Sequence, residues 1–135
     1  WNRPEETKNV LSEDGWFKTG DMAILREDGF YKLVDRKKDM ILVSGFNVYP
    51  NEIEGVLSSH ANVMETAVVG GPSVKTGEEV LAYVTTSGEV TSETLLAYCR
   101  ENLTAYKVPK KITILDALPK SAVGKILRRE LRNTV

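Results

Sequence analysis

Five consecutive charged residues, 35–39 (DRKKD), interrupt the chain between two apolar stretches. Unpaired charges are too costly to bury in a hydrophobic core, so this run predicts a connection at the surface. It is the best candidate for a boundary in the chain. The sequence therefore divides into a short N-terminal part and a longer C-terminal part.

The N-terminal part has the pattern of a β-hairpin. Apolar residues 22–25 and 30–34 flank the dipeptide Asp28-Gly29, which is typical of the turn between two antiparallel strands. Two paired strands are therefore predicted over residues 21–35.

The C-terminal part alternates between strand and helix patterns. Strands are predicted over residues 40–43, 63–69, 80–85 and 111–115, and helices after Pro50, after Thr91 and over 126–132. A loop with Gly70, Gly71, Pro72 and Gly77 is expected between the second and third strands. This order gives a small α+β or α/β sandwich, and we expect the α+β form, a small sheet flanked by helices, over residues 37–135.

Local signals predict the ends and buried faces of two helices. Pro50 suits the first turn of one helix, and Ile53 and Leu57 fall on a single face of it. Thr91 can cap the other helix, and Cys99 belongs to its buried stripe. The lone cysteine is therefore interpreted as a core residue.

The composition excludes several classes of protein. A chain of 135 residues with 41% hydrophobic residues can bury an ordinary core, so it needs neither disulfides nor a structural metal. A single cysteine forms no internal disulfide and fits a reducing compartment, so a cytoplasmic location is expected. No apolar run approaches the roughly 18 to 20 residues of a membrane span, so any membrane contact is expected to be peripheral.

Charge is unevenly distributed along the chain. The totals are 18 basic and 19 acidic residues, but from Lys107 onward eight residues are basic and two are acidic. This basic end indicates either an anionic partner, such as nucleotide phosphates, nucleic acid or an acidic surface, or simply a solvated face. No aromatic residues alternate with these late basic residues, which argues against stacking on single-stranded nucleic acid.

The residues needed for several common active sites are missing. His60 is the only histidine and has no partner at a metal-ligand spacing, so a structural role is expected for it and no metal site is predicted. Gly124-Lys125 resembles part of a phosphate-binding P-loop. However, Pro119 stands where that motif needs glycine, and Ile126 stands where it needs serine or threonine. The P-loop interpretation therefore fails.

Four motifs occur in an order that resembles the adenylate-forming enzymes. They are residues 14–21 (DGWFKTGD), 35–39 (DRKKD), 44–54 (SGFNVYPNEIE) and 119–125 (PKSAVGK). This superfamily includes acyl-CoA synthetases, peptide-synthetase adenylation domains and firefly-type luciferases. The second and third motifs are most similar to those of bacterial long-chain fatty acid–CoA ligases. The resemblance covers essentially the whole chain.

The resemblance implies that this chain is a fragment. In these enzymes a large N-terminal domain carries the acyl pocket, most of the ATP site and a phosphate loop rich in glycine, serine and threonine, none of which the sequence contains. Residues 1–35 would be the tail of that domain, and residues 36–135 the mobile C-terminal lid with the expected α+β fold. The isolated fragment is expected to be inactive.

Three residues match positions that handle ATP in the family. Lys125 matches the catalytic lysine, whose ammonium offsets the negative charge that accumulates when a carboxylate meets an α-phosphate. Asp21 matches an aspartate that accepts hydrogen bonds from both ribose hydroxyls, and Arg36 matches an arginine near the ribose and phosphates. Acetylation of Lys125 would remove its charge and is therefore expected to inactivate the enzyme.

Other matches concern the lid movement and coenzyme A. In the family the lid rotates about the residue two places after the arginine, here Lys38, between the two half-reactions. After rotation, Ser44, Gly45 and Phe46 would face the cleft, where the glycine leaves room for pantetheine. Three basic residues are candidate contacts for the nucleotide end of coenzyme A; they are Arg100, Lys107 and Lys110.

The predicted function is that of a C-terminal fragment of an ATP-dependent long-chain fatty acid–CoA ligase. ATP and Mg²⁺ would be bound mainly by the missing domain, and coenzyme A would be a co-substrate. The expected partners are these substrates, the fatty acid and the N-terminal domain of the same chain, with no nucleic acid; the parent could associate peripherally with the inner membrane. Two alternatives stay open: the lid of another acid–CoA ligase or amino-acid adenylating enzyme, and an independent basic binding module.

Overall fold

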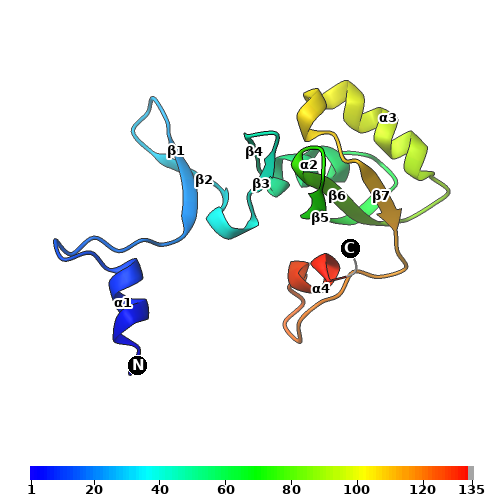
Figure 1. The fold of residues 1–135 in the computed structure, drawn as a ribbon. Helices are drawn as coiled ribbons and strands as arrows, with labels where there is room; N and C mark the ends of the chain where they lie inside the picture. Colours follow the sequence, from blue (N-terminus) through cyan, green and yellow to red (C-terminus); the bar gives the residue numbers. More distant parts are fainter. Residues whose placement is uncertain (134–135) are drawn as a thin grey trace. The chain divides into compact units, whose positions relative to one another are not determined.

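The computed structural model describes residues 1–133. Its helices and strands, in chain order, are α1 (Pro4–Val10), β1 (Asp21–Leu25), β2 (Tyr31–Arg36), β3 (Ile41–Val43), β4 (Phe46–Val48), α2 (Pro50–Ser58), β5 (Val63–Ser73), β6 (Gly77–Thr86), α3 (Ser92–Asn102), β7 (Lys111–Ile114) and α4 (Arg128–Arg132) (Figure 1). Two 3₁₀ turns span Lys37–Asp39 and Ala105–Lys107. The chain divides into two compact units between Lys38 and Asp39.

The first unit is a β-hairpin preceded by a short helix. Strands β1 and β2 pair antiparallel, with Asp21 opposite Arg36. Apolar side chains of the hairpin are exposed, with 60% of Leu25 and 69% of Leu33 open to solvent. In this unit only Asp35 is buried. The predicted hairpin is therefore present, and it has no hydrophobic core of its own.

The second unit is a small mixed sheet flanked by helices, as predicted. The strand order is β4-β3-β6-β5 with antiparallel neighbours, and β7 pairs parallel to β6. The long pairing of β5 with β6 runs from Val63 opposite Thr86 to Ser73 opposite Gly77. Both strands are rich in β-branched residues, which suit a pleated and partly buried surface.

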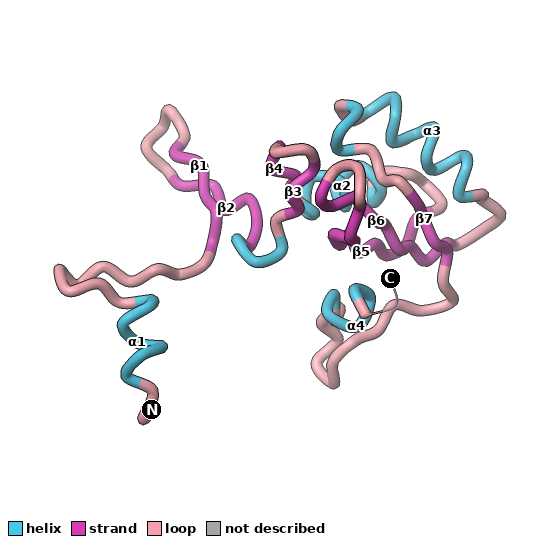
Figure 2. Tube along the Cα trace, viewed as in Figure 1, coloured by secondary structure: helices cyan, strands magenta, loops and turns pink. Residues whose placement is uncertain are grey.

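Alternate residues of β5 and β6 build one hydrophobic core on each face of the sheet. The first core contains Val68, Val80, Ala82 and Val84 from the sheet, with Ile53, Leu57, Leu95 and Cys99 from α2 and α3. The second core contains Ala67, Val69, Leu81 and Tyr83 from the sheet, with Leu118 and Leu131 from the C-terminal segment. Helices α2 and α3 therefore cover one face and α4 covers the other (Figure 2).

The helices follow the local signals in the sequence. Pro50 occupies the first turn of α2, and Oγ1 of Thr91 accepts a hydrogen bond from the N–H of Thr94 at 3.2 Å, which caps α3. Burial raises the pKa of the Cys99 thiol to about 11. At neutral pH Cys99 is therefore an uncharged core residue.

The predicted loop between the second and third strands is wrong. Residues 70–72 continue β5, and Gly77 begins β6. A Cβ atom on Gly70 would lie 2.9 Å from Oε1 of Glu78 and 3.2 Å from Cγ2 of Ile41, so the glycine allows close packing of these two side chains rather than a turn. Strand β5 lies at the edge of the sheet, where the proline of this segment is tolerated.

The charged run at residues 35–39 is a surface connection only in its middle. Its three basic residues are exposed, but Asp35 and Asp39 at its ends are buried. Asp35 accepts a hydrogen bond from the backbone N–H of Arg36 at 2.7 Å, and Asp39 is ion-paired with arginines of the C-terminal segment. Burial is possible because both carboxylates have polar partners, which the run itself does not reveal.

Two elements differ in extent from the prediction. Residues 46–48 form a strand, β4, which pairs with β3 and is too short to stand out in the sequence. The terminal helix begins at Arg128 rather than at Ile126, because Ile126 instead pairs with Lys120 across the preceding loop.

Ile53 offers a test of the first core, since it is fully buried, whereas Val74 is fully exposed. Ile53→Ala should lower the free energy of unfolding by about 2 to 5 kcal/mol, because it leaves a cavity. Val74→Ala, the matched exposed truncation, should change it by about 0.5 kcal/mol or less. Urea unfolding followed by circular dichroism measures both. Equal effects of the two variants would contradict this assignment of the core.

Candidate functional site

Lys125 lies at the end of a loop that closes on itself. The backbone N–H of Ser121 donates to the carbonyl of Lys125 at 2.8 Å, and the Oγ of Ser121 accepts from the N–H of Lys125 at 3.1 Å. The N–H of Gly124 donates to the carbonyl of Ser121 at 2.9 Å, and a φ of +80° at Gly124 allows this turn. The side chain of Lys125 is exposed. An ordered loop therefore presents an ammonium group on a long stem.

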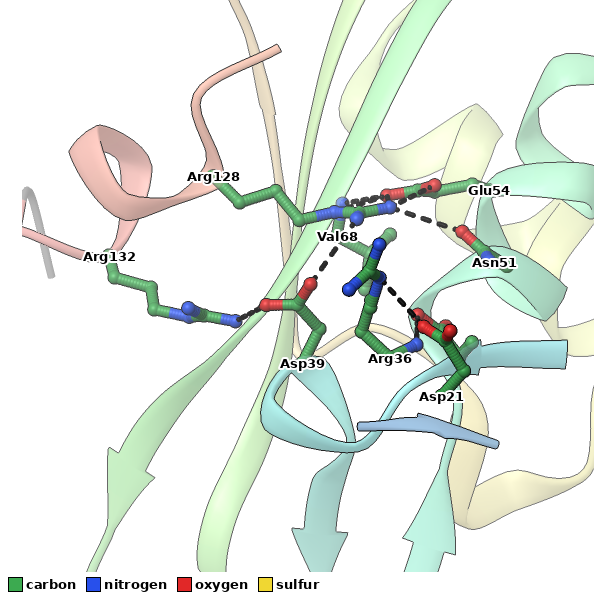
Figure 3. A network of polar contacts seen from close by, with 9 residues as sticks. Asp21, Arg36, Asp39, Asn51, Glu54, Val68, Arg128 and Arg132 are labelled. Carbon is green, nitrogen blue, oxygen red and sulfur yellow. Dashed lines mark hydrogen bonds and ion pairs between the residues drawn. The ribbon is translucent and has the colours of Figure 1, made fainter. Parts of the chain in front are cut away.

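Strand pairing brings Asp21 and Arg36 together. They are opposite each other in the β1–β2 hairpin, and Nε of Arg36 lies 2.9 Å from Oδ1 of Asp21 (Figure 3). The N–H of Asp21 donates to Oγ1 of Thr19 at 3.1 Å, and the N–H of Lys37 donates to the carbonyl of Gly20 at 2.8 Å. A carboxylate and a guanidinium thus lie side by side, and such groups suit hydroxyl and phosphate ligands.

Lys38 lies in the 3₁₀ turn Lys37–Asp39, and its side chain is exposed. The division between the two units follows this residue directly. Arg36 belongs to the first unit, as the last residue of β2. The hinge role of Lys38 and the domain boundary before Arg36 stay predictions.

Ser44 and Gly45 form the two-residue turn between β3 and β4. Both have positive φ angles, 50° and 85°, as in a type I′ turn. The N–H of Ser44 donates to the carbonyl of Thr76 at 2.9 Å. The ring of Phe46 stacks on that of Tyr106, with the centroids 4.8 Å apart. Contacts from two other segments therefore hold the turn in place.

An open pocket of about 620 Å³ lies beside this turn. Polar residues from three separate segments contribute to its lining; they are Ser44, Ser73, Lys75, Thr76, Glu79, Tyr106 and Lys110. Val43, Val80 and Val108 add an apolar part. The pocket brings together two of the residues predicted to contact coenzyme A, Ser44 and Lys110.

Lys107, another of those predicted contacts, is held by α2. Its Nζ lies 2.6 Å from Oε1 and 2.8 Å from Oε2 of Glu52, and 5.7 Å from the ring centroid of Tyr106. The hydrogen bond to Glu52 raises the pKa of Lys107 above its ordinary value. Lys107 therefore stays protonated with its charge already paired, whereas Arg100 and Lys110 are exposed.

Several interacting residues were not foreseen from the sequence. Arg128 of α4 forms an ion pair with Glu54 of α2, with Nη2 2.7 Å from Oε2, and a longer one of 3.7 Å with Asp39 (Figure 3). It also donates to Oδ1 of Asn51 at 3.1 Å. Glu54 and Arg128 are 74 positions apart, so no local spacing indicates their contact. No sequence pattern indicated the contact of Tyr106 with Phe46 either.

Within residues 1–133, no three His, Cys, Asp or Glu side chains gather in a way that could hold a metal ion. The ring of His60 lies edge-on to that of Tyr98, with centroids 5.1 Å apart, and its Nδ1 accepts the N–H of Asn62 at 3.3 Å. These contacts fit a structural role for the histidine.

In the part of the chain that the structure describes, no helix has both the length and the apolar character needed to cross a bilayer.

Curated proteins similar to this chain include acid–CoA ligases by name. The chain is 59% identical over 134 residues to a long-chain-fatty-acid–CoA ligase of Yersinia pestis. The match covers 98% of this chain and 24% of that protein. It is 47% identical over 135 residues to a 2-succinylbenzoate–CoA ligase of Bacillus cereus. This match covers 100% of this chain and 28% of that protein. The chain therefore spans about a quarter of the length of these curated relatives.

A solved structure with the same fold is that of ATP-bound MatB from Rhodopseudomonas palustris. It matches with a TM-score of 0.93 at 36% identity, over 99% of this chain and 27% of that chain. The AMP-binding enzyme C-terminal domain matches residues 52–125, which is more than half of the chain. The order of the motifs, the α+β fold and the similarity to these proteins all indicate the same family. The chain therefore belongs to the AMP-binding enzyme C-terminal domain family of the adenylate-forming enzymes.

Proposed function

We propose that the chain is the C-terminal part of an ATP-dependent long-chain fatty acid–CoA ligase. This enzyme would convert a fatty acid, ATP and coenzyme A into acyl-CoA, AMP and pyrophosphate through an acyl adenylate. The 59% identity to a protein with that name supports the substrate class. The observation that carries the proposal is the exposed Lys125 on its self-closed loop, in a chain of this family.

The reaction needs two steps because a carboxylate is a poor electrophile at neutral pH. In the first step, a carboxylate oxygen attacks the α-phosphorus of ATP, a phosphoanhydride bond breaks, and pyrophosphate leaves with the electron pair. In the second step, the thiol sulfur of coenzyme A attacks the acyl carbon. AMP then leaves with the electron pair, and the thiol proton is lost to solvent.

We assign Lys125 to the first step, as its catalytic residue. Two anions meet in that step, and a positioned ammonium stabilises the growing charge most where water is excluded. The hydrogen bonds of Ser121 hold the backbone of the loop, while the long lysine stem supplies reach. The second step needs a thiol rather than a cation, so the lysine must be able to withdraw.

Asp21 and Arg36 are assigned to the nucleotide. The carboxylate would accept hydrogen bonds from the ribose hydroxyls, and the guanidinium would donate to the ribose or the phosphates. Their 2.9 Å ion pair orients both groups before the nucleotide arrives. An oriented pair loses less conformational entropy on binding than two independent side chains would.

Residues 1–35 would be the end of a large N-terminal domain, and residues 36–135 its lid. The exposed apolar side chains of Leu25 and Leu33 support this assignment, because a hairpin without its own core needs another surface to cover it. The lid would rotate about Lys38 between the two steps. The N-terminal domain of the same chain would then be the main partner, and the isolated chain would be inactive.

Coenzyme A would enter along the turn formed by Ser44 and Gly45 and past the adjoining Phe46 of β4. Gly45 has no side chain to obstruct pantetheine, and the neighbouring pocket adds the ammonium of Lys110. Arg100 and Lys107 are the other proposed contacts for the phosphates of the nucleotide end. The ion pair of Lys107 with Glu52 makes its contribution smaller than that of the other two.

ATP would be bound with Mg²⁺ mainly by the N-terminal domain. Residues 1–133 contain no cluster of carboxylates that fits the ion, so no residue of this chain is assigned to it. When bound, the ion would shield phosphate charge. We expect a cytoplasmic location, which the single unpaired cysteine favours, with any contact of the parent with the inner membrane peripheral.

Another acid–CoA ligase is the second candidate. The 47% identity to a 2-succinylbenzoate–CoA ligase supports it, because the lid performs the same steps whatever the acyl group. Acyl specificity would depend on the N-terminal domain. Purified full-length enzyme offered palmitate and 2-succinylbenzoate in parallel separates the two candidates, and a preference for the aromatic acid would contradict the fatty acid assignment.

Lys125→Ala in the full-length enzyme should slow adenylate formation by about 10²-fold or more, because a charge contact made in the transition state is lost. Thioester formation from supplied acyl adenylate should be spared. Pyrophosphate release and acyl-CoA production measure the two steps separately. Lys111→Ala, which removes another exposed lysine of the same basic end, should affect neither. Equal loss in both steps would argue against the assigned role.

Lys38→Pro should give the opposite result. Proline restricts the backbone torsion about which the lid would turn, so thioester formation should slow while adenylate formation is retained. Lys38→Ala keeps backbone freedom and should leave both steps intact. Single-turnover measurements of each half-reaction test this, and normal thioester formation in Lys38→Pro would dismiss the hinge.

Arg100→Ala and Lys110→Ala should raise the KM for coenzyme A with kcat unchanged, because exposed charges attract the phosphates without contacting the reacting atoms. The effect should shrink as salt rises, since such attraction is screened. Lys107→Ala should have a smaller effect, because its ammonium is already paired with Glu52. Steady-state kinetics at low and high salt measure this. A KM that is insensitive to all three changes would remove these contacts from the proposal.

A further inference from the structure

The C-terminal segment that carries Lys125 is attached to the sheet by apolar side chains and, at the start of the lysine loop, by an ion pair of 2.6 Å between Nζ of Lys120 and Oε1 of Glu65 in β5. Leu118 and Leu131 are buried against β5 and β6, and Ile126 is partly buried against the same core. Hydrophobic contacts hold the segment on the sheet but have little directionality. They do not by themselves determine the orientation of the Lys125 loop.

Arg128, three residues after Lys125, makes directional contacts. Its Nη2 lies 2.8 Å from Oε1 and 2.7 Å from Oε2 of Glu54, and its Nε lies 3.2 Å from Oε1 (Figure 3). Nη2 also donates to Oδ1 of Asn51 at 3.1 Å. A guanidinium that contacts both oxygens of a carboxylate has a narrow range of geometries. Helix α2 therefore determines the direction of the Arg128 side chain.

The same arginine reaches the first residue of the second unit. Its Nη1 lies 3.7 Å from Oδ2 of Asp39, and Nη2 of Arg132 lies 2.7 Å from Oδ1 of Asp39. Asp39 is 8% exposed, and Glu54 also accepts the backbone N–H of Val68 at 2.8 Å. Each carboxylate thus has more than one donor, which offsets the cost of its burial. The Arg128 cluster, as we name it, comprises Asp39, Asn51, Glu54, Arg128 and Arg132.

We propose that Arg128 is a positioning residue for adenylate formation. The proposal rests on the proposed function, with Lys38 as the hinge and Lys125 as the catalytic lysine. Asp39 directly follows the hinge, and Arg128 closely follows the lysine loop. The Arg128 cluster therefore joins the hinge end of the lid to the segment that carries the lysine. Rotation about Lys38 then moves the ammonium of Lys125 together with the sheet as one rigid piece.

The alternative is that the Arg128 cluster only stabilises the fold. In that case the two half-reactions should fall together, as folded enzyme is lost. Positioning predicts a selective loss, because only adenylate formation uses Lys125, and an error of about 1 Å in its position can cost about 10²-fold in rate. Removal of Arg128 leaves the apolar anchors and the other donors of both carboxylates in place, so the segment should stay docked.

The test compares Arg128→Gln with Arg129→Gln in the full-length parent enzyme. Arg129 is the exposed neighbour on the same helix, so its variant loses the same charge without touching the Arg128 cluster. Pyrophosphate release reports adenylate formation, supplied acyl adenylate reports thioester formation, and thermal unfolding reports the fold. We expect Arg128→Gln to slow adenylate formation by about 10²-fold and thioester formation by less than about 2-fold. Arg129→Gln should match the wild type.

Glu54→Gln is the second variant, because its amide can still accept the N–H of Val68 while the charge facing Arg128 is gone. It should show the same selective loss. The double variant Glu54→Gln/Arg128→Gln should be no slower than Arg128→Gln, since both changes act through one contact. The positioning role would be overturned if the rate losses of the two single variants multiplied in the double variant. It would also be overturned if a variant slowed both half-reactions equally.

Lys125→Ala, measured alongside, separates two kinds of failure. If Lys125→Ala forms the adenylate normally, the proposed function fails and this inference fails with it. If Lys125→Ala is inactive in that step while Arg128→Gln is unaffected, the proposed function stands and Arg128 has no positioning role.

Discussion

The antiparallel pairing of β5 with β6 determines where every candidate site of the second unit lies. Successive side chains along these strands point to opposite faces, so Val68 faces α2 and α3 while Val69 faces the C-terminal segment. A shift of the pairing by one residue would exchange the two faces and leave both cores without partners. The same register places Val80 at the pocket beside Ser44. Lys125 and the pocket therefore have fixed positions on a single scaffold.

Local features of this fold could be predicted from the sequence, and long-range contacts could not. The Asp28-Gly29 turn, Pro50 at the start of α2 and the Thr91 cap of α3 each depend on a few neighbouring residues. The four motifs also supplied most of the candidate site residues, whereas Arg100, Lys107 and Lys110 lie outside them. Pairs such as Glu54 with Arg128 join segments that only folding brings together, so no spacing indicates them. Gly70 misled the prediction because its role, close packing inside a strand, has the same local signature as a turn.

The basic end of the chain combines two kinds of cation. Four of its eight basic residues are paired with carboxylates of the same chain; they are Lys107, Lys120, Arg128 and Arg132. The charge asymmetry in the sequence is therefore partly structural, because these cations hold elements together rather than attract a partner. The exposed side chains of Lys110 and Lys125 belong to the other kind. Net charge alone does not separate the two roles, whereas burial and pairing do.

Glu78 joins β6 to β3 in an unusual way. The backbone ladder between these strands has a single pair, Val43 opposite Gly77, and the carboxylate of Glu78 adds a bond by accepting the N–H of Leu42 at 2.7 Å. That carboxylate occupies the space where a side chain on Gly70 would lie. The two sites are thereby coupled: a side chain at position 70 would push the carboxylate of Glu78 aside and so weaken its bond to the N–H of Leu42. The effects of substitutions at positions 70 and 78 should therefore depend on each other.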